Sequence, residues 1–467
     1  MKLEKVFWAL TTAVIAALLI PSLIKDDMFL DGVTYAAISK NNGLGSFWQP
    51  HYTQTKDAAF YGHPPLVFGI QSLLFSVLGE SLYVERFYTF LTAILTALGI
   101  ALCWRLFFNG SELKKYSWLP VLLWITTPLV LWANKNNILE NTLGVFTIFS
   151  AYFITKSLMN KSGLDMFLGS LLIVLAFLSK GPVGLFPLVA PFVFIVVYGF
   201  QNSNRTFITA FSVVVITVLL FTGLFIFIPE SKANIVSYLS IQLLPAISSH
   251  GEATTNNRFS ILLDLCIELL VAILLLAGFC FQQWKNTKKV SLQNQKTALY
   301  FLLIAIAAAL LLIVSLKQRK YYLTPSIPFY IMAVSALIVP QVRSFMAMLS
   351  ESAKSWLLRI SYAALVGVFL FAVLRFGKFV NEKPLIADAY AISIVIPQGS
   401  VIAANTDVAQ DWRLVAYLAR IGYLSIDDKN THEYFLKRKS DNSVLNSESN
   451  YTELDLGLNA YRLYKMK

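Results

Sequence analysis

Two long apolar runs, interrupted by one charged break, indicate the class of fold: residues 163–200 read GLDMFLGSLLIVLAFLSKGPVGLFPLVAPFVFIVVYGF. The runs 163–179 and 182–200 are each close to the roughly 20 helical residues that cross the hydrocarbon core of a bilayer. Lys180, Gly181 and Pro182 stand between them, and the glycine and proline are residues that end helices. Two apolar helices joined by such a short connection are typical of a multi-pass membrane protein.

The same pattern recurs along the whole chain. Of the 467 residues, 57% are hydrophobic and 14% are charged, whereas a soluble domain has about 25% charged residues. We therefore predict an all-α polytopic membrane protein with about eleven transmembrane helices. The predicted spans are 6–24, 86–108, 117–133, 139–157, 163–179, 182–200, 207–228, 260–284, 298–316, 321–341 and 356–376.

Basic residues between the spans predict the orientation. With the N-terminus in the cytoplasm, most Lys and Arg of the connections lie on the cytoplasmic side, as the positive-inside rule requires. The short apolar stretch 64–79 opens with two prolines, and counting it as a span would place the basic connection 285–296 outside. We therefore predict that 25–85 forms one large first periplasmic loop with surface helices.

The composition becomes that of a soluble domain after the last span. Val401–Ala404 has the pattern of a buried strand, 407–421 that of an amphipathic helix, and Tyr461–Tyr464 that of a final strand. We predict a transmembrane domain over 1–376 and a small C-terminal periplasmic α/β domain over 377–467.

The net charge of +12 does not indicate a nucleic-acid partner, because orientation and anionic headgroups explain basic loops in a membrane protein. Cys103, Cys266 and Cys280 lie in apolar stretches without metal-ligand spacing, so neither zinc nor a disulfide framework is indicated. The long polar connection 229–259 is typical of a mobile lid or a binding loop.

Two carboxylates are candidates for chemistry. Asp31, in the first outer loop, is either the N-cap of a short helix or a general base at the membrane surface. Glu140 stands at the outer mouth of a span, where a carboxylate is costly and faces a cavity or a partner; an ion pair with Lys135 is the alternative. We expect Asp26 and Asp27 to be solvated loop charges.

Cations gather at the outer ends of spans, against the insertion bias, and cations retained there indicate an anionic ligand. Lys180 either reaches phosphate oxygens near the headgroups or extends along its helix to water. The other members of this group are Lys135, Arg86 and the segment Lys317, Arg319 and Lys320, which continues into Tyr321 and Tyr322.

His63 precedes two prolines that fix an extended approach to a helix. It is either a hydrogen-bonding surface residue or a ligand. Asp31, Glu140 and His63 would have to converge to hold a divalent cation, and no spacing in the chain requires one. The sequence assigns no metal ligands and leaves a requirement for a divalent cation open, and it identifies no cofactor.

These motifs, in their order along the chain, resemble the C-type integral-membrane glycosyltransferases. The nearest branch looks like the bacterial relatives of protein O-mannosyltransferases and of the lipid A aminoarabinose transferase. The resemblance covers roughly 1–340. It rests on Asp31 followed by Tyr35, the stretch Gly62-His63-Pro64-Pro65-Leu66, Arg86, Glu140, the stretch Leu178-Ser179-Lys180-Gly181-Pro182-Val183-Gly184, and Arg319-Lys320-Tyr321-Tyr322-Leu323-Thr324-Pro325.

The resemblance implies an inverting transfer of a sugar from a polyprenyl-phosphate donor to an envelope acceptor: a lipid, a protein or a glycan. The reaction would take place on the periplasmic face of the bacterial cytoplasmic membrane. By this analogy Asp31 is the candidate base and Glu140 a second carboxylate near the reacting centre. The implied substrate-binding residues are Tyr35, His63, Arg86, Lys180, Lys317, Arg319, Lys320, Tyr321 and Tyr322.

The chain departs from the family's pattern at three places: Gly32 follows Asp31 where relatives carry a second acid, Glu140 replaces an Asp, and His63 replaces a Lys. These differences leave the sugar and the acceptor undetermined, and the sequence does not indicate an oligomeric state. A flippase of lipid-linked sugars and a polymerase or ligase using diphosphate-linked glycans remain alternatives. Clustering of the ionisable residues on one side favours the transferase.

Overall fold

The structure is a computed structural model of the 467-residue chain. It describes residues 3–25, 27–42, 47–56, 59–199, 203–248, 253–286, 290–376, 383–441 and 450–467. Asp26 and residues 249–252 of the predicted lid lie outside these ranges. The chain forms two compact units. Unit 1 contains Met1–Ser22, Thr89–Lys135 and Leu139–Leu374, and unit 2 contains Leu23–Tyr88, Asn136–Ile138 and Arg375–Lys467.

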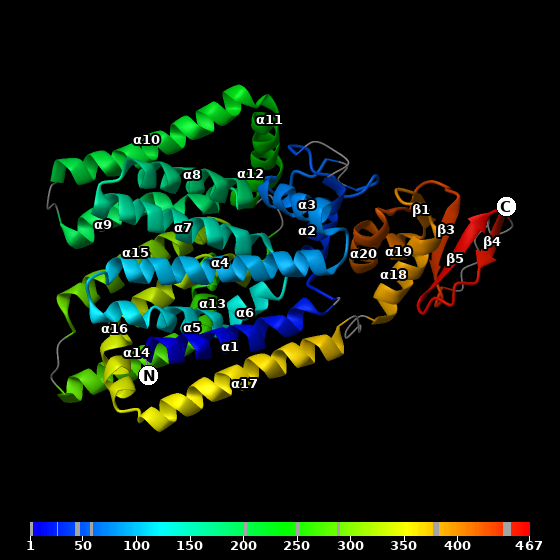
Figure 1. Ribbon diagram of the computed structural model, residues 1–467. Coiled ribbons are helices and arrows are strands. Elements are labelled where there is room, and N and C mark those ends of the chain that lie inside the picture. The colour runs from blue at the N-terminus through cyan, green and yellow to red at the C-terminus, as the bar shows by residue number, and fades with distance from the viewer. Residues whose placement is uncertain are drawn as a thin grey trace. The chain divides into compact units, whose positions relative to one another are not determined.

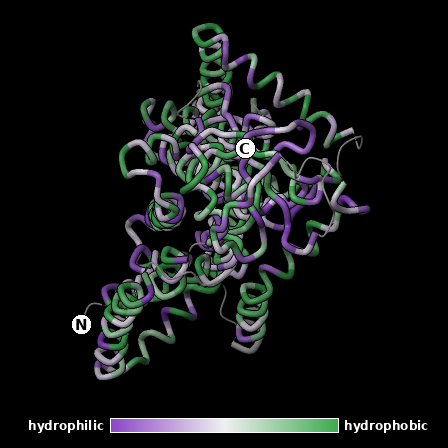
Figure 2. The backbone as a smooth tube through the Cα atoms, turned by 90° about the vertical axis from the view of Figure 1, so that its right-hand side faces the viewer, coloured by the Kyte–Doolittle hydropathy of each residue, from purple (hydrophilic) through white to green (hydrophobic). Residues whose placement is uncertain are grey.

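Unit 1 is built from apolar helices, as predicted. Among the described residues, eight helices are long and apolar enough to cross a membrane. In Figure 2 most turns of the long helices are green, the colour of hydrophobic residues. The eight are α1 Leu3–Leu23, α4 Tyr83–Phe107, α7 Leu139–Asn160, α8 Gly163–Lys180, α10 Ser203–Phe227, α15 Leu292–Ile313, α16 Ile327–Ala347 and α17 Glu351–Arg375.

Two further predicted spans are bent helix pairs, which raise the number of described spans to as many as ten. Glu112–Ile125 meets Pro128–Asn134 at 78°, where Pro128 interrupts the helix, and Ser260–Glu268 meets the following helix at 67°. The predicted span 182–200 is instead a shorter apolar segment, so the number of about eleven spans stays a prediction. The elements are η2 Glu112–Tyr116, α5 Trp118–Ile125, α6 Pro128–Asn134, η3 Pro182–Val189, α9 Ala190–Tyr198, α13 Ser260–Glu268 and α14 Leu270–Asn286.

The prediction of an irregular lid at 229–259 is wrong over its first half. The chain there continues as α11 Pro229–Tyr238, a π-helical turn η4 Leu239–Leu243, and α12 Leu244–Ile247. Pro229 occupies the start of α11, where its missing N–H costs nothing, and Ile235 and Tyr238 are buried. The polar composition of this segment concealed its helical structure.

Close helix packing organises the centre of unit 1, where α8 lies between α7 and α10 (Figure 1). Gly169 of α8 approaches Ile154 of α7 so closely that a Cβ would lie 2.7 Å from its side chain. The Ser150 hydroxyl donates to the Gly169 carbonyl at 2.9 Å. Small residues and hydroxyls at such crossings are typical of membrane helices.

Unit 2 contains a small mixed sheet, which confirms the predicted α/β character of the C-terminal segment. The strand order is β2-β1-β3-β5-β4, with β1 parallel to β2 and β3, and β5 antiparallel to β3 and β4. The strands are β1 Val401–Ala404, β2 Ser425–Asp427, β3 Tyr434–Arg438, β4 Tyr451–Leu454 and β5 Tyr461–Met466. The helices are α2 Leu30–Asn41, α3 Leu66–Leu78, α18 Lys383–Val395, α19 Thr406–Ala409 and α20 Trp412–Gly422, together with the first turns of α4.

The first loop and the C-terminal segment belong to this same unit, an association that the sequence did not indicate. The Gln54 amide nitrogen of the backbone donates to the Ser425 hydroxyl at 2.9 Å, and the Thr55 hydroxyl donates to the Ile426 carbonyl at 2.8 Å. The Lys40 ammonium donates to the Ile421 carbonyl at 2.8 Å. Hydrogen bonds between side chains and backbone groups therefore attach the first loop to β2 and to the end of α20.

A buried ion pair connects α20 with the start of α4. Arg420 and Glu85 are each 1% exposed, and the guanidinium Nη2 lies 2.8 Å from Glu85 Oε2. The same guanidinium donates to the Glu80 and Ser81 carbonyls at 3.0 Å and lies 4.7 Å from the centre of the Phe75 ring. The Nε and Nη2 groups of this arginine are therefore both hydrogen-bonded within unit 2.

Candidate functional site

A buried ion pair in unit 1 joins two of the residues predicted from sequence. Glu140, in the first turn of α7, is 1% exposed and binds Lys180, the last residue of α8, which is 9% exposed. Each charge lies at the helix end whose dipole favours it. Lys180 is therefore buried against a carboxylate, and it does not extend to water as one of the alternatives supposed.

Aromatic rings complete the surroundings of Lys180. Its ammonium lies 4.0 Å from the ring centre of Tyr322 and 5.6 Å from that of Tyr321. Tyr321 stacks on Trp132, with ring centres 5.5 Å apart. The 3-10 turn η5 Lys320–Leu323 presents both tyrosines, and the negative faces of aromatic rings attract a cation.

The chain leaves α8 through a turn that accepts only glycine. Gly181 has φ +82°, a conformation that other L-residues rarely adopt, and a Cβ there would lie 2.3 Å from the Tyr238 hydroxyl. That hydroxyl donates to the Lys180 carbonyl at 3.3 Å. The Gly-Pro break predicted from sequence thus places Lys180 at a fixed helix end.

Gln318 organises the segment that precedes the two tyrosines, a role that sequence reasoning missed. Its side-chain NH₂ donates to the Arg258, Leu312 and Ser315 carbonyls at 2.7, 3.1 and 3.0 Å, and its side-chain oxygen accepts from the Ser260 hydroxyl at 3.0 Å. The side chain is almost fully buried. A glutamine among cations carries no sequence signal for this role.

The three cations of this segment differ in their exposure and in their partners. Lys317 is half-buried, whereas Arg319 and Lys320 are exposed. Lys320 lies 3.5 Å from Glu268, whose other carboxylate oxygen accepts from the Leu129 backbone N–H at the start of α6 at 2.8 Å. Glu268 therefore stabilises a helix N-terminus and holds Lys320, and sequence reasoning did not identify it.

Asp31 lies in unit 2, as the second residue of α2, and its side chain is half-buried. The residue at the N-cap position is Phe29, and no side chain caps the helix. The N-cap alternative for Asp31 is therefore wrong. A carboxylate in the first turn of a helix still interacts favourably with the helix dipole.

Two asparagines hold the start of α2 on either side of Asp31. The Asn136 side-chain oxygen accepts from the Phe29 backbone N–H at 2.7 Å, and the Asn137 amide donates to the Gly32 carbonyl at 3.3 Å. A Cβ at Gly32 would lie 3.0 Å from the Asn137 backbone nitrogen, which explains why glycine follows Asp31. These asparagines precede Glu140 in sequence, yet their spacing gives no sign of the contact.

Tyr35, His63 and Arg86 also lie in unit 2. The Tyr35 hydroxyl and His63 Nε2 are 3.1 Å apart, so the structure brings these two predicted residues together. Arg86 is 3% exposed and donates to the Asp27 carbonyl. Among the residues that the structure describes, no group of three or more His, Cys, Asp or Glu side chains is placed to hold a metal ion.

Comparison with known proteins bears on the fold of both units. Residues 62–229 match the profile of the family described as dolichyl-phosphate-mannose-protein mannosyltransferase, a stretch that contains His63, Arg86, Glu140 and Lys180. The crystal structure of ArnT from Cupriavidus metallidurans bound to undecaprenyl phosphate superposes with a TM-score of 0.63 at 16% identity. The match covers 98% of this chain and 97% of that one. This chain has the fold of a C-type membrane glycosyltransferase.

ArnT without ligand gives a TM-score of 0.62 at 16% identity and covers 97% of both chains. An oligosaccharyltransferase from Archaeoglobus fulgidus, tethered to an acceptor peptide, gives 0.47 at 12% identity over 90% of this chain and 64% of that one. No curated protein matches the sequence. The resemblance to C-type glycosyltransferases and the fold class are thus confirmed, and the roles of single residues stay predictions.

Proposed function

We propose that the chain is an inverting glycosyltransferase. In this proposal it moves a sugar from a polyprenyl-phosphate-linked donor to an envelope acceptor on the outer face of the cytoplasmic membrane. The observation that carries the proposal is the buried Lys180, held by Glu140 and faced by Tyr322. An ion pair inside a membrane domain costs desolvation energy, and such residues are commonly retained for function.

Lys180 is suited to receive the phosphate that leaves the sugar. As the bond between the sugar carbon and the phosphate oxygen breaks, its electron pair stays on the phosphate, whose negative charge grows. A fixed cation in a site of low dielectric stabilises that charge more than it stabilises the intact donor. On this proposal the phosphate displaces the Glu140 carboxylate from Lys180, so that the ammonium remains paired with one anion throughout.

Asp31 is the proposed base. Its carboxylate accepts the proton of the acceptor's nucleophilic group while that group forms the new bond to the sugar carbon from the opposite side, which inverts the configuration. Asn136 and the close approach of Gly32 hold the first turn of α2, so the carboxylate starts from a fixed backbone position.

Two comparisons support the class of donor. ArnT, which shares the fold, binds undecaprenyl phosphate, and the family whose profile matches is named for a dolichyl-phosphate-linked mannose. Both names describe a sugar carrier or its lipid phosphate. Neither the sugar nor the acceptor is carried over to this chain by these names.

The test uses the full-length protein in proteoliposomes with radiolabelled polyprenyl-phosphate sugars and a cell-envelope extract. We expect the wild type to transfer label to an acceptor and Asp31→Asn to transfer it about 10²–10⁴-fold more slowly. Asp428→Asn is the matched control, because Asp428 is an exposed aspartate of the same unit.

Label that crosses the bilayer without reaching an acceptor would replace the proposal with a flippase. Transfer only from diphosphate-linked glycans would replace it with a polymerase or ligase. Equal rates for Asp31→Asn and Asp428→Asn would remove Asp31 as the base and leave the transferase standing.

A further inference from the structure

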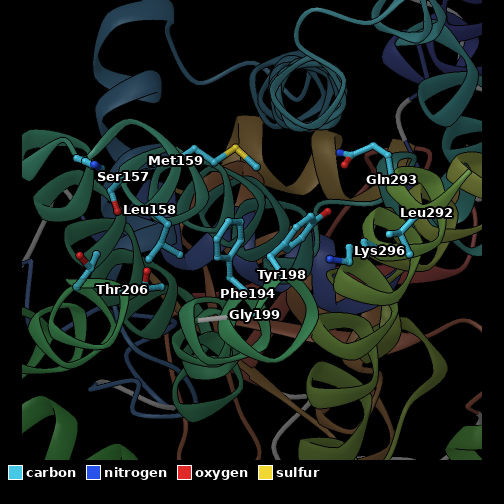
Figure 3. A pocket seen from close by; sticks show the side chains of 12 residues that line it. Ser157, Leu158, Met159, Phe194, Tyr198, Gly199, Thr206, Leu292, Gln293 and Lys296 are labelled. Atoms are coloured by element: carbon cyan, nitrogen blue, oxygen red, sulfur yellow. The ribbon is translucent and has the colours of Figure 1, made fainter. Parts of the chain in front are cut away.

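Unit 1 contains a cavity of about 400 Å³, formed by the ends of α7, α9, α10 and α15 (Figure 3). Figure 3 shows Phe194 and Tyr198 at its centre, Lys296 and Gln293 on the side of α15, and Leu158 and Thr206 on the opposite side. A cavity of this size falls within the range of small-molecule sites.

The cavity lies far from Lys180. Glu140 is in the first turn of α7, whereas Leu158 and Met159 are in its last turn, and a helix of 22 residues at 1.5 Å per residue is roughly 30 Å long. Along α15, likewise, Lys296 is in the second turn, and the segment of Lys317 follows the other end. Since the hydrocarbon core is about 30 Å thick, the two sites belong to opposite faces of the bilayer.

The walls of the cavity carry positive charge. Two lysines, Lys161 and Lys296, line it, and the described residues of its lining include no carboxylate. Neither lysine forms an ion pair within the described part of the chain, and the Lys296 ammonium lies 5.7 Å from the ring centre of Tyr198. A cavity with two cations and no acid is complementary to an anion.

Hydroxyl groups and helix ends add to this preference. Thr206 and Thr209 line the cavity from the beginning of α10, and Lys296 lines it from the beginning of α15. The N-terminal turns of helices carry partial positive charge, and threonine hydroxyls donate hydrogen bonds to phosphate oxygens. The remaining wall is apolar, because Leu158 and Phe194 contribute side chains without polar groups.

We infer that this cavity binds a phosphate group, supplied either by the headgroup of an anionic lipid or by free phosphate. Lys161 and Lys296 neutralise the phosphate, the hydroxyls of Thr206 and Thr209 orient it, and the apolar wall accommodates the neighbouring part of a lipid. This site is independent of the proposed transfer reaction, since it uses none of the residues assigned to that reaction.

Native mass spectrometry of the detergent-solubilised full chain tests the inference. Phosphatidylglycerol and inorganic phosphate are titrated separately into wild type and into the double variant Lys161→Asn, Lys296→Gln. Asparagine suits position 161, where φ is +60°. The matched control is Lys114→Gln, Lys115→Gln, which removes the same charge from exposed positions outside the cavity.

We expect one molecule to bind the wild type and the control alike, and the cavity variant at least tenfold more weakly. Loss of phosphatidylglycerol binding alone identifies a lipid headgroup, and loss of inorganic phosphate binding identifies free phosphate; either outcome supports the site. Equal binding by the cavity variant and the control, or equal weakening in both, would overturn it.

Discussion

Lys180 and Glu140 form an ion pair that is hard to explain by stability alone. Both side chains are buried, and the desolvation of two charges often costs more than their attraction returns. Replacing such a pair by apolar residues is frequently neutral or stabilising. The pair is therefore best understood through what each charge does when an anionic ligand arrives.

The two members of the pair should affect lipid-phosphate binding in opposite directions. Lys180→Gln removes the cation that we propose receives the phosphate, so the Kd for undecaprenyl phosphate should rise about tenfold or more. Glu140→Gln removes the competing carboxylate, so the Kd should fall. Binding to the reconstituted protein measures both, with Lys354→Gln, an i,i+3 surface pair with Glu351, as the control.

A rise of Kd in both variants would show that the pair acts only as a structural unit. A fall in Glu140→Gln accompanied by slower transfer would assign Glu140 a further role in the reaction. The measurement needs no knowledge of the sugar, because undecaprenyl phosphate itself is the probe.

For single residues, the sequence predicted local features and missed contacts between residues that are far apart in the chain. Lys180 was identified because Gly181 and Pro182 mark the end of its helix within three residues. Gln318 and Asn137 were missed, because each has partners far away in sequence, Ser260 and Gln71, and an amide side chain has no periodicity that signals a contact. The chemistry of a residue is readable locally, whereas its partners are set by the fold.

Helix α20 is attached to the start of α4 by the Arg420–Glu85 pair, and this pair should be important for the stability of unit 2. Arg420→Met leaves the Glu85 carboxylate buried without its cation, a change that typically costs about 3–5 kcal/mol. Amide hydrogen exchange in α2 and α20 should accelerate by two orders of magnitude or more.

The double variant Arg420→Met, Glu85→Leu removes both charges and should recover most of the protection. Arg462→Gln, an exposed arginine of β5, is the control and should exchange as the wild type does. If the single and double variants exchanged equally fast, the pair would contribute packing and not charge compensation.

The turn between β2 and β3 should loosen only in strong acid. Hydrogen bonds from His432 and Asn430 lower the pKa of the Asp427 carboxyl from 3.8 to about 2. Because the pKa of this carboxyl is lower in the folded than in the unfolded state, its ionised form stabilises the folded turn. This stabilisation is fully present above about pH 4 and is lost as the pH falls through about 2.

Exchange of the amides between Asp427 and His432, corrected for intrinsic rates, should therefore be constant from pH 7 to about pH 4 and then accelerate. Asp427→Asn should abolish that acid-dependent acceleration. An acceleration that began near pH 6 would show that another group controls the turn.

At the scale of elements, hydropathy predicted the positions of the long helices well, since each must contain a long apolar run. It did not predict the 78° bend before Pro128, because length and composition are the same for a straight span and a bent one. The strands β2, β3 and β4 were missed, because strands of three to five residues are too short for a periodic pattern.

The whole molecule presents a wide apolar surface, and α17 shows it most clearly. Only 6% of the most apolar 18-residue stretch of this helix is buried, and side chains such as Val366 and Phe369 are exposed. An exposed hydrophobic helix of this length is stable only in lipid. The surface of unit 1 thus requires a bilayer, in agreement with the composition of the chain.

Val366→Arg should reduce membrane integration, because an arginine near the middle of a span costs about 2.5–3.5 kcal/mol on the insertion scale. Val366→Leu is the control and should integrate as the wild type does. Protease protection of α17 in membranes, which reports whether this one helix is integrated, measures the effect. Equal integration of both variants would mean that α17 does not cross the bilayer.

The joint unit formed by the first loop and the C-terminal segment has a consequence for biosynthesis. Gln54 and Thr55 emerge from the ribosome early, but their hydrogen-bond partners on β2 are synthesised 371 residues later. Throughout that interval the loop has no partner strand, so unit 2 can assemble only after the helices that lie between the loop and β2 in the chain have been synthesised. Synthesis of nearly the whole chain is therefore a condition for the assembly of unit 2.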